Sequence, residues 1–273
     1  NSRKLFSSFN YIKILNKLNP NIIFIHTSVI IKTLIFNFFK KSKLVFVDHT
    51  SNQVKRKNDW INLFISCLFF KKIIFLAKFH QKEIQNNLFF KMFKSKFKLI
   101  KPGIIFKKKN SKYKKIKNYK NFFIKLGMAS RFTKGKNHIN LINAFQRIQN
   151  KINLNFKLSL VGTGPEQTKI KNYLDKNNLN KFVKLEGLKN NKNMKKWYEE
   201  IDVYIHWSKG EVVSRSILEA MQNQKIIFAS NIPSTKEQLF SGFKCGILFK
   251  DEKDFVNKFN KYYSKNLKNK NLR

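Results

Sequence analysis

The chain has 273 residues, enough for two domains that each bury a core, and its 57 lysines and arginines against 15 aspartates and glutamates give a formal net charge of +42. Its two cysteines, Cys67 and Cys245, lie far apart and outside any CxxC pair, which excludes a disulfide-stabilised secreted scaffold. The longest apolar run, Trp60 to Phe70, ends at two lysines and is too short to cross a bilayer, so it predicts a buried helix.

The positive charge is typical of proteins that bind nucleic acid or an anionic membrane. Nearly all of it comes from lysine, however, and Lys, Asn, Ile and Phe are abundant from end to end, as expected of a coding sequence rich in A and T. We therefore expect no specific nucleic-acid partner. The cysteines lie in apolar surroundings, so they favour buried free thiols in a reducing compartment and predict a cytoplasmic protein. Its basic and aromatic N-terminal half would suit a peripheral contact with the inner face of an anionic membrane.

The first hundred residues alternate short apolar runs with segments of helical pattern. Buried strands are expected at 21–26, at 43–48 and at the run IIFLA near residue 75, with helices between them. A single helix is expected near 80–95, before FKLIKPGI closes the series. Such alternation predicts βαβ units and a parallel sheet, in a first domain over 1–106.

Residues 107–121, KKKNSKYKKIKNYKN, are almost wholly polar and basic and have no period that would bury a face. Either a polyanion-binding patch or a solvated linker would have this composition. We interpret the segment as a basic linker between two domains, since such linkers are exposed and polar.

The second half repeats the alternation more clearly. Strands are expected at 122–129, 156–162, 181–187, 202–208 and 225–230, with helices between them and a last helix from about 251. The pattern predicts a doubly wound domain with a parallel sheet over 122–273. Ligands of such sheets bind beyond the carboxyl ends of the strands.

The segment GMASRFTKGKN, 127–137, joins a strand to a helix and so lies where such a sheet binds its ligand. Its glycine spacing and Asn137, in place of Ser or Thr, exclude a Walker phosphate loop. Arg131 and Lys136 still place two cations on this turn, which would suit a diphosphate, although an ordinary surface role fits the loop equally well. VGTGPE, 161–166, lacks the third glycine of a dinucleotide fingerprint and is interpreted as a tight turn before a helix.

The segment GEVVSRSILEAM, 210–221, holds two glutamates in a mostly apolar stretch. Ser214 is a good N-cap, so Glu211 is expected in a loop and Glu219 about a turn and a half into the following helix. Backbone N–H groups near Arg215 and Ser216 would form an anion site at the helix N-terminus. A nucleotide diphosphate sugar would fit this arrangement, and so would two solvated glutamates at a helix end.

The five histidines, at 26, 49, 80, 138 and 206, have no metal-ligand spacing with another His, Cys or carboxylate, and the chain has no D-x-D pair. No bound catalytic metal is therefore expected. His49 and His206 each follow a predicted strand on the ligand side of its sheet. For both, a structural and a functional role are equally compatible with the sequence.

In chain order, SRFTKGKNHINLINAF, LSLVGTGPE, VKLEG and DVYIHWSKGEVVSRSILEAM are followed by a strand and GILF. This series resembles the C-terminal domain of glycosyltransferase family 4, the retaining enzymes of the GT-B fold, over 122–250. IIFIHTS, LVFVDHTS and LIKPGI, within 20–108, more weakly resemble the later part of the family's N-terminal domain. The resemblance implies an α/β fold with two Rossmann-like, doubly wound parallel-sheet domains. The acceptor-side N-terminal domain would be truncated, since the chain begins near the helix before the family's fourth strand.

The resemblance also implies a role for each residue of the donor site. Arg131 and Lys136 would hold the donor diphosphate, together with the backbone N–H groups around Arg215 and Ser216. Glu219 would bind the ribose. The donor would be a nucleotide-diphosphate-sugar, bound without a metal or another cofactor.

Two further residues are catalytic candidates on the same basis. Glu211 would contact the donor sugar near its reacting carbon, and His49 matches a histidine that faces the sugar from the N-terminal domain. The acceptor hydroxyl would attack from the face that the diphosphate leaves, which retains the configuration. Val212 departs from the family, which usually has glycine at this position. The difference is expected to change the loop, because a β-branched residue cannot easily take the backbone angles of a glycine.

The sequence thus predicts a retaining, metal-independent hexosyltransferase-like enzyme that acts on a sugar or lipid-linked acceptor in cell-surface polysaccharide, lipopolysaccharide or glycolipid synthesis. One alternative is a sugar epimerase of the same fold, which would need further catalytic carboxylates and histidines. Another is a non-catalytic basic protein that binds nucleic acid or an anionic membrane through its lysines, with an affinity that falls steeply with salt.

Overall fold

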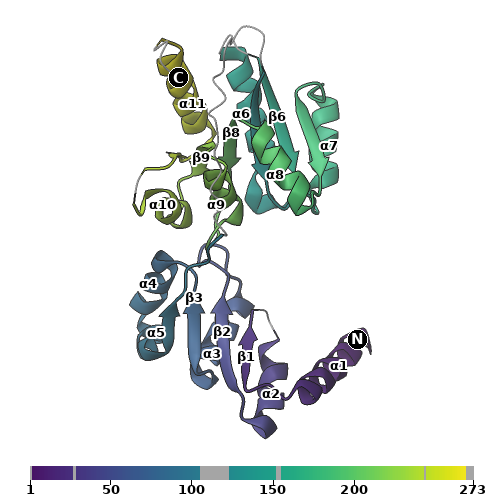
Figure 1. Cartoon of the computed structure of the whole chain (residues 1–273), viewed down its shortest axis with the longest axis vertical. Coiled ribbons are helices and arrows are strands. Elements are labelled where there is room, and N and C mark those ends of the chain that lie inside the picture. The colour runs from purple at the N-terminus through teal and green to yellow at the C-terminus, as the bar shows by residue number, and fades with distance from the viewer. Residues whose placement is uncertain (1, 27–28, 105–122, 152–154, 243, 269–273) are drawn as a thin grey trace. The chain divides into compact units, whose positions relative to one another are not determined.

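The computed structural model of the chain describes residues 2–26, 29–104, 123–151, 155–242 and 244–268 (Figure 1). The expected linker at 107–121 lies outside these residues. The chain divides into two compact units. The N-terminal unit consists of Asn1–Pro102 with Gly210–Val213, and the C-terminal unit consists of Gly103–Lys209 with Ser214–Arg273.

The N-terminal unit is built on a four-stranded parallel sheet in the order β1-β2-β3-β4. Its strands are β1 (Ile22–Ile25), β2 (Lys43–Asp48), β3 (Lys72–Phe75) and β4 (Phe97–Leu99). Alternate residues of β2 point to opposite faces, as the pleat requires: Leu44 and Phe46 join the main core, and Val45 and Val47 join a smaller cluster on the other face.

In the described part of this unit the helices beside the sheet are α1 (Ser2–Leu18), α2 (Ile30–Lys40), α3 (Lys57–Phe69), α4 (Lys78–Asn86) and α5 (Leu88–Lys91), followed by the 3-10 helix η1 (Lys94–Lys96). The single helix expected near 80–95 is therefore wrong. Asn87 ends α4 and caps α5, because its side-chain oxygen accepts a hydrogen bond from the Phe89 N–H at 3.0 Å. The expected buried helix is α3, which buries only one side, since Phe69 on the other is 65% exposed.

The C-terminal unit has a six-stranded parallel sheet in the order β10-β9-β8-β5-β6-β7. Its strands are β5 (Ile124–Ala129), β6 (Phe156–Val161), β7 (Val183–Gly187), β8 (Val203–His206), β9 (Ile226–Ser230) and β10 (Ile247–Phe249). From β5 the chain adds β6 and β7 on one side and then β8, β9 and β10 on the other. The strand order therefore reverses between β5 and β8, which makes this the switch point of the sheet.

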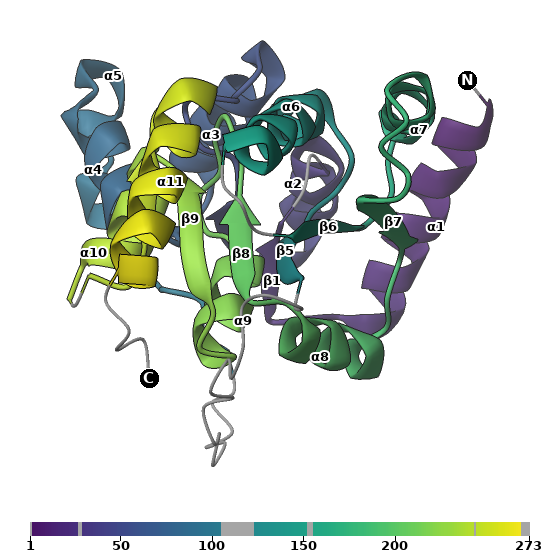
Figure 2. The same cartoon turned by 90° about the horizontal axis from the view of Figure 1, so that it is seen from above.

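Helices cover both faces of this sheet (Figure 2). On one face lie α6 (His138–Lys151), α7 (Gln167–Lys176) and α11 (Glu252–Lys268), whose apolar side chains form the larger core with the strands. On the other lie α8 (Asn191–Glu200), α9 (Arg215–Gln222) and α10 (Pro233–Phe240). A helix at α10 is not among the sequence expectations, although Pro233 at its first position is a recognised start signal.

The two parallel sheets with their helices confirm the α/β class and the doubly wound C-terminal domain. Of the two cysteines expected to be buried free thiols, Cys67 is buried, whereas Cys245 is exposed, and both are free. No helix in the described part of the chain has the length and apolar character needed to cross a membrane.

Candidate functional site

The loops that follow β5 and β8 leave the C-terminal sheet side by side at its switch point. The Lys209 N–H donates a hydrogen bond to the Gly135 carbonyl at 2.9 Å, and the Lys136 Nζ donates one to the Ser208 Oγ at 3.2 Å. These contacts join the loop that carries the expected cations to the loop that leads into α9. In open α/β sheets the crevice at this point is the usual ligand site.

The β5 loop, residues 130–137, has the form that its residues favour. It contains the 3-10 helix η3 (Lys134–Lys136) and ends at Asn137, whose φ of 46° lies in the left-handed region that asparagine tolerates. Arg131 is exposed and Lys136 is half-buried. The loop therefore presents two cations without the geometry of a Walker loop.

The glycine turn after β6 supports the β5 loop. Gly162 and Gly164 have φ values of 135° and 159°, and a Cβ on Gly162 would lie 1.9 Å from the Ser130 carbonyl oxygen. The Phe132 N–H donates to the Thr163 carbonyl at 2.9 Å. VGTGPE is thus a tight turn, as expected, and its glycines allow two backbones to touch directly behind Arg131.

Helix α9 begins at the other side of the switch point. The Ser214 Oγ accepts a hydrogen bond from the Ile217 N–H at 3.4 Å, which makes Ser214 the N-cap that the sequence predicts. The backbone N–H groups of Arg215 and Ser216 lie in the first turn of α9, where no carbonyl of the same helix can accept a hydrogen bond from them. They are therefore the donors that α9 presents at its N-terminus. Gln238 of α10 fixes the cap, since its side chain bonds both the N–H and the carbonyl of Ser214.

Glu219 lies half-buried one turn further along α9. Its Oε2 accepts a hydrogen bond from the Tyr198 hydroxyl of α8 at 3.1 Å. Sequence reasoning missed Tyr198, because nothing in the spacing of α8 and α9 indicates which α8 side chain reaches this carboxylate.

His206, at the end of β8, is 1% exposed. Its ring lies 6.5 Å from that of Tyr204, and its Nδ1 is 3.5 Å from the Ser214 Oγ. The burial of His206 and its contact with Ser214 favour a structural role over a functional one. A side chain this buried beside the N-cap supports α9 and does not contact a ligand.

His49, which follows β2 in the N-terminal unit, is exposed and has an imidazole partner that sequence reasoning missed. The His26 Nδ1 lies 2.8 Å from the His49 Nε2, with the ring centroids 5.1 Å apart. Loss of hydration and the neighbouring His26 lower the pKa of His49, while Asp48 acts in the opposite direction. His49 is thus held as a mainly neutral imidazole near pH 7.

Glu211 belongs with the N-terminal unit, because Gly210–Val213 groups with that unit while Ser214 and α9 belong to the C-terminal one. Lys136 and α9 therefore belong to one unit, and Glu211 and His49 belong to the other. Val212 is buried, and it is not among the described non-glycine residues with positive φ, which are Asn19, Lys41, Asn137, Asn178 and Gln224.

A buried ionic cluster includes Asp48, the residue that precedes His49 in the chain. The Lys55 Nζ lies 2.9 Å from both the Asp48 Oδ2 and the His80 Nε2, and the Thr50 N–H donates to the Asp48 Oδ1 at 3.1 Å. The side chains of Lys55 and His80 are 0% exposed and that of Asp48 is 4% exposed. Burial raises the pKa of Asp48 and lowers that of Lys55, so desolvation outweighs the attraction for each partner.

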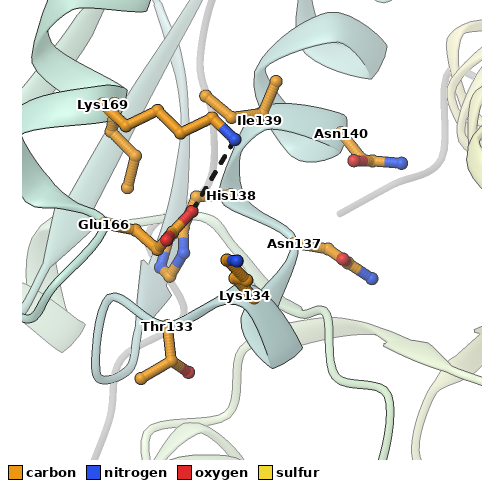
Figure 3. A pocket seen from close by; sticks show the side chains of 9 residues that line it. Thr133, Lys134, Asn137, His138, Ile139, Asn140, Glu166 and Lys169 are labelled. Atoms are coloured by element: carbon orange, nitrogen blue, oxygen red, sulfur yellow. Dashed lines mark ion pairs between the residues drawn. The ribbon is translucent and has the colours of Figure 1, made fainter.

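A small hollow of about 150 Å³ opens at the N-terminus of α6 (Figure 3). Glu166 and Lys169 line it and form an ion pair at 3.9 Å, with His138, Thr133 and Asn137 around them. Neither Arg131 nor Lys136 lines it. Among the residues that the structure describes, the hollow included, no group of three His, Cys, Asp or Glu side chains could hold a metal ion.

His138 makes the C-terminal unit sensitive to acid. Burial, and secondarily Lys136, lower its pKa from 6.5 to about 4, so the folded chain resists the proton that the unfolded chain binds below pH 6.5. The free energy of unfolding should therefore fall as the pH drops from 6.5 towards 4, by roughly 2 kcal/mol at pH 5 from this residue. Urea unfolding at pH 7.5 and pH 5 measures the loss, which should be smaller in His138→Asn. An equal loss in the variant would contradict this origin.

Comparison with known proteins places this geometry in context. A family model described as glycosyl transferases group 1 matches residues 106–273. The uncharacterized glycosyltransferase MJ1069 of Methanocaldococcus jannaschii is 31% identical over 224 residues, which are 78% of this chain and 56% of that protein. The capsular polysaccharide biosynthesis glycosyltransferase CapH of Staphylococcus aureus is 23% identical over 246 residues, 86% of this chain and 66% of that protein. The chain thus spans less than two thirds of the length of either relative.

Among solved structures, that of HepE from Anabaena with UDP-glucose matches with a TM-score of 0.75 and 20% identity. The match covers 96% of this chain and 73% of that one. At this identity the likeness shows the fold, which is GT-B, as the sequence predicts. From the family match over residues 106–273, the chain belongs to the glycosyl transferases group 1.

Proposed function

We propose that this protein is a retaining glycosyltransferase that moves a sugar from a nucleotide-diphosphate-sugar to an acceptor in cell-surface polysaccharide or glycolipid synthesis. The observation that carries the proposal is the meeting of the Lys136 loop and the α9 loop at the switch point of the C-terminal sheet. The family match, the name of the CapH relative and the UDP-glucose bound to HepE support it.

In this proposal the donor lies across the switch point. Arg131 and Lys136 hold the two phosphates, and the first-turn N–H groups of Arg215 and Ser216 meet them from α9. Glu219, one turn further along α9, accepts hydrogen bonds from the ribose hydroxyls. Groups of opposite charge thus bind different parts of the nucleotide, because the cations and N–H groups suit the diphosphate and the carboxylate suits the diol.

The proposed reaction breaks the bond between the anomeric carbon and the diphosphate oxygen. The acceptor oxygen forms the new bond on the same face, and the acceptor proton passes to the departing diphosphate, so the configuration is retained. Fixed cations and helix N–H groups stabilise the charge that develops on the leaving group. We propose that these groups serve in place of a metal ion, which a titration in the presence of EDTA checks directly.

We propose that the N-terminal unit serves the acceptor on the cytoplasmic side of the cell membrane, where lipid-linked acceptors and an anionic surface are both present. His49 would face the sugar, and its lowered pKa keeps it neutral and able to accept a hydrogen bond at neutral pH. Glu211 would contact the donor sugar near the reacting carbon. Val212, which is buried, would set the backbone of that loop in place of the usual glycine.

Arg131→Ala and Glu219→Ala are each expected to weaken the binding of UDP by tenfold or more, because each removes one charged group that a charge-assisted hydrogen bond requires. Isothermal titration of the full chain with UDP, in EDTA, measures the effect. Arg147→Ala and Glu200→Ala are the matched controls, since both residues lie on exposed parts of α6 and α8.

Wild-type affinity in both site variants would overturn the assignment of the donor site. Binding of UDP that is lost steeply with salt and is equal in all four variants would favour the alternative of a basic polyanion-binding protein.

A further inference from the structure

The hydroxyl of Tyr198 lies inside the C-terminal unit at the meeting of α8 and α9. It is 3.1 Å from the Glu219 Oε2 and 3.1 Å from the Ser216 carbonyl oxygen, and the residue is 2% exposed. Both partners belong to α9, so one buried phenol contacts the first turn of that helix and the carboxylate one turn later. Tyr198 precedes Glu219 by 21 residues in sequence.

The hydroxyl can act only as a donor here. Burial raises the pKa of Tyr198, and Tyr204 and Glu219 raise it further, so the phenol keeps its proton across the whole working range of pH. Its two neighbours at 3.1 Å are both oxygen acceptors, a backbone carbonyl and a carboxylate. Its single proton is shared between these two acceptors, and the contact with Oε2 restrains the Glu219 carboxylate while Oε1 has no bond to the phenol.

The position of this hydroxyl is set by the core rather than by the site. The Tyr198 ring packs against Trp197 with centroids 5.0 Å apart and against Tyr204 at 5.9 Å. The Trp197 Nε1 donates to the Ser159 Oγ at 2.7 Å, which ties α8 to β6. A Cβ on Gly127 would lie 2.6 Å from the Trp197 ring, so the glycine of β5 makes room for this packing.

We propose that Tyr198 is a positioning residue that orients Glu219 to receive the two hydroxyls of a ribose. This inference rests on the proposed function, in which Glu219 binds the nucleotide through its diol. Its basis is the combination of a hydroxyl locked in a packed core, a carboxylate that is half-buried beside it, and a shared contact with the first turn of α9. A carboxylate that is already held in one orientation loses less conformational freedom when it binds a ribose than a mobile carboxylate does.

Tyr198→Phe removes the hydroxyl and keeps the ring, so it isolates the proposed contact. Its dissociation constant for UDP should rise about tenfold, the usual effect of one hydrogen bond to a charged group. The constant for 2′,3′-dideoxy-UDP should change less than about twofold, because that nucleotide has no diol for Glu219 to receive. Isothermal titration of the full chain with both nucleotides gives the ratio of the two constants, which a purely structural role of Tyr198 would not alter.

If Tyr198→Phe also lowers stability, a second pair of variants separates its effect through Glu219 from a general loss of stability. In a Glu219→Ala background, adding Tyr198→Phe should leave the affinity for UDP unchanged, since the residue acts through the side chain at position 219. Tyr204→Phe is the matched control: it removes another buried hydroxyl, which bonds the Ala129 carbonyl at 3.4 Å, and should keep the preference for UDP over its dideoxy analogue.

Two results would overturn the inference while the proposed function stands: UDP affinity unaltered in Tyr198→Phe, or equal loss for UDP and 2′,3′-dideoxy-UDP. A different result would overturn the proposed function itself. This would be a wild-type chain that binds neither UDP nor ADP, CDP or GDP, or a Glu219→Gln variant that binds UDP as tightly as the wild type.

Discussion

Gly162→Ala is expected to destabilise the C-terminal unit by about 3 to 5 kcal/mol, one of the two largest effects that the structure predicts. The new Cβ would lie 1.9 Å from the Ser130 carbonyl oxygen, at a φ of 135° that residues with a side chain rarely adopt. The backbone of either the β6 turn or the β5 loop must therefore move. The β5 loop carries Arg131, so the affinity for UDP should fall together with the free energy of unfolding.

Urea unfolding followed by circular dichroism measures the loss of stability. Gly135→Ala is the control from the neighbouring loop, because a Cβ there meets nothing within 4 Å and its φ is not positive. Its free energy of unfolding should stay within about 0.5 kcal/mol of the wild type. A Gly162→Ala variant as stable as Gly135→Ala would show that the two loops do not touch as described.

Lys55→Met is expected to destabilise the N-terminal unit by about 3 kcal/mol or more, because it leaves the buried Asp48 carboxylate without its cation. The deficit should depend on pH in a defined direction. Burial raises the pKa of Asp48, and loss of the ammonium raises it further, so the variant's carboxyl takes up a proton as the pH falls and the folded state regains stability. The deficit should therefore be smaller at pH 5 than at pH 8.

Thermal and urea unfolding of Lys55→Met, Asp48→Asn and the double variant measure this coupling. The double variant should recover part of the loss, because no unpaired charge remains in the core. Lys82→Met, on the exposed side of α4, is the control and should differ little from the wild type. Equal deficits for Lys55→Met and Lys82→Met would contradict the ion pair.

The features that the sequence predicted correctly depend on residues close together in the chain. The β-strands follow from short apolar runs, and Ser214 was predictable as a cap because its Oγ bonds an N–H only three residues later. The break between α4 and α5 is also local, but it depends on whether Asn87 caps a new helix or continues the old one. Propensity alone does not distinguish these outcomes for an asparagine inside an apolar stretch.

The features that the sequence did not reveal are contacts between distant segments. Tyr198 reaches Glu219 from a helix whose neighbouring residue, Trp197, packs over Gly127, and both contacts depend on how closely α8 packs on the sheet. The pairing of His26 with His49 joins the ends of β1 and β2, and the ionic cluster joins Asp48 to His80 of α4. In the sequence, each of these side chains has an ordinary structural explanation of its own. It is the parallel register of β1, β2 and β3 that brings each residue next to its partner.

Hydrogen–deuterium exchange of the full chain with and without UDP tests most directly the claim that the nucleotide binds at the switch point of the C-terminal sheet. Bound UDP should protect peptides that contain residues 127–137 and 207–222, which include the contact between Lys136 and Ser208 and the helix α9. Peptides of α7, which contributes Lys169 and Ile170 to the hollow beside Glu166, should be unaffected. Protection confined to α6 and α7, or none at all under conditions in which titration shows UDP to be bound, would contradict binding at the switch point.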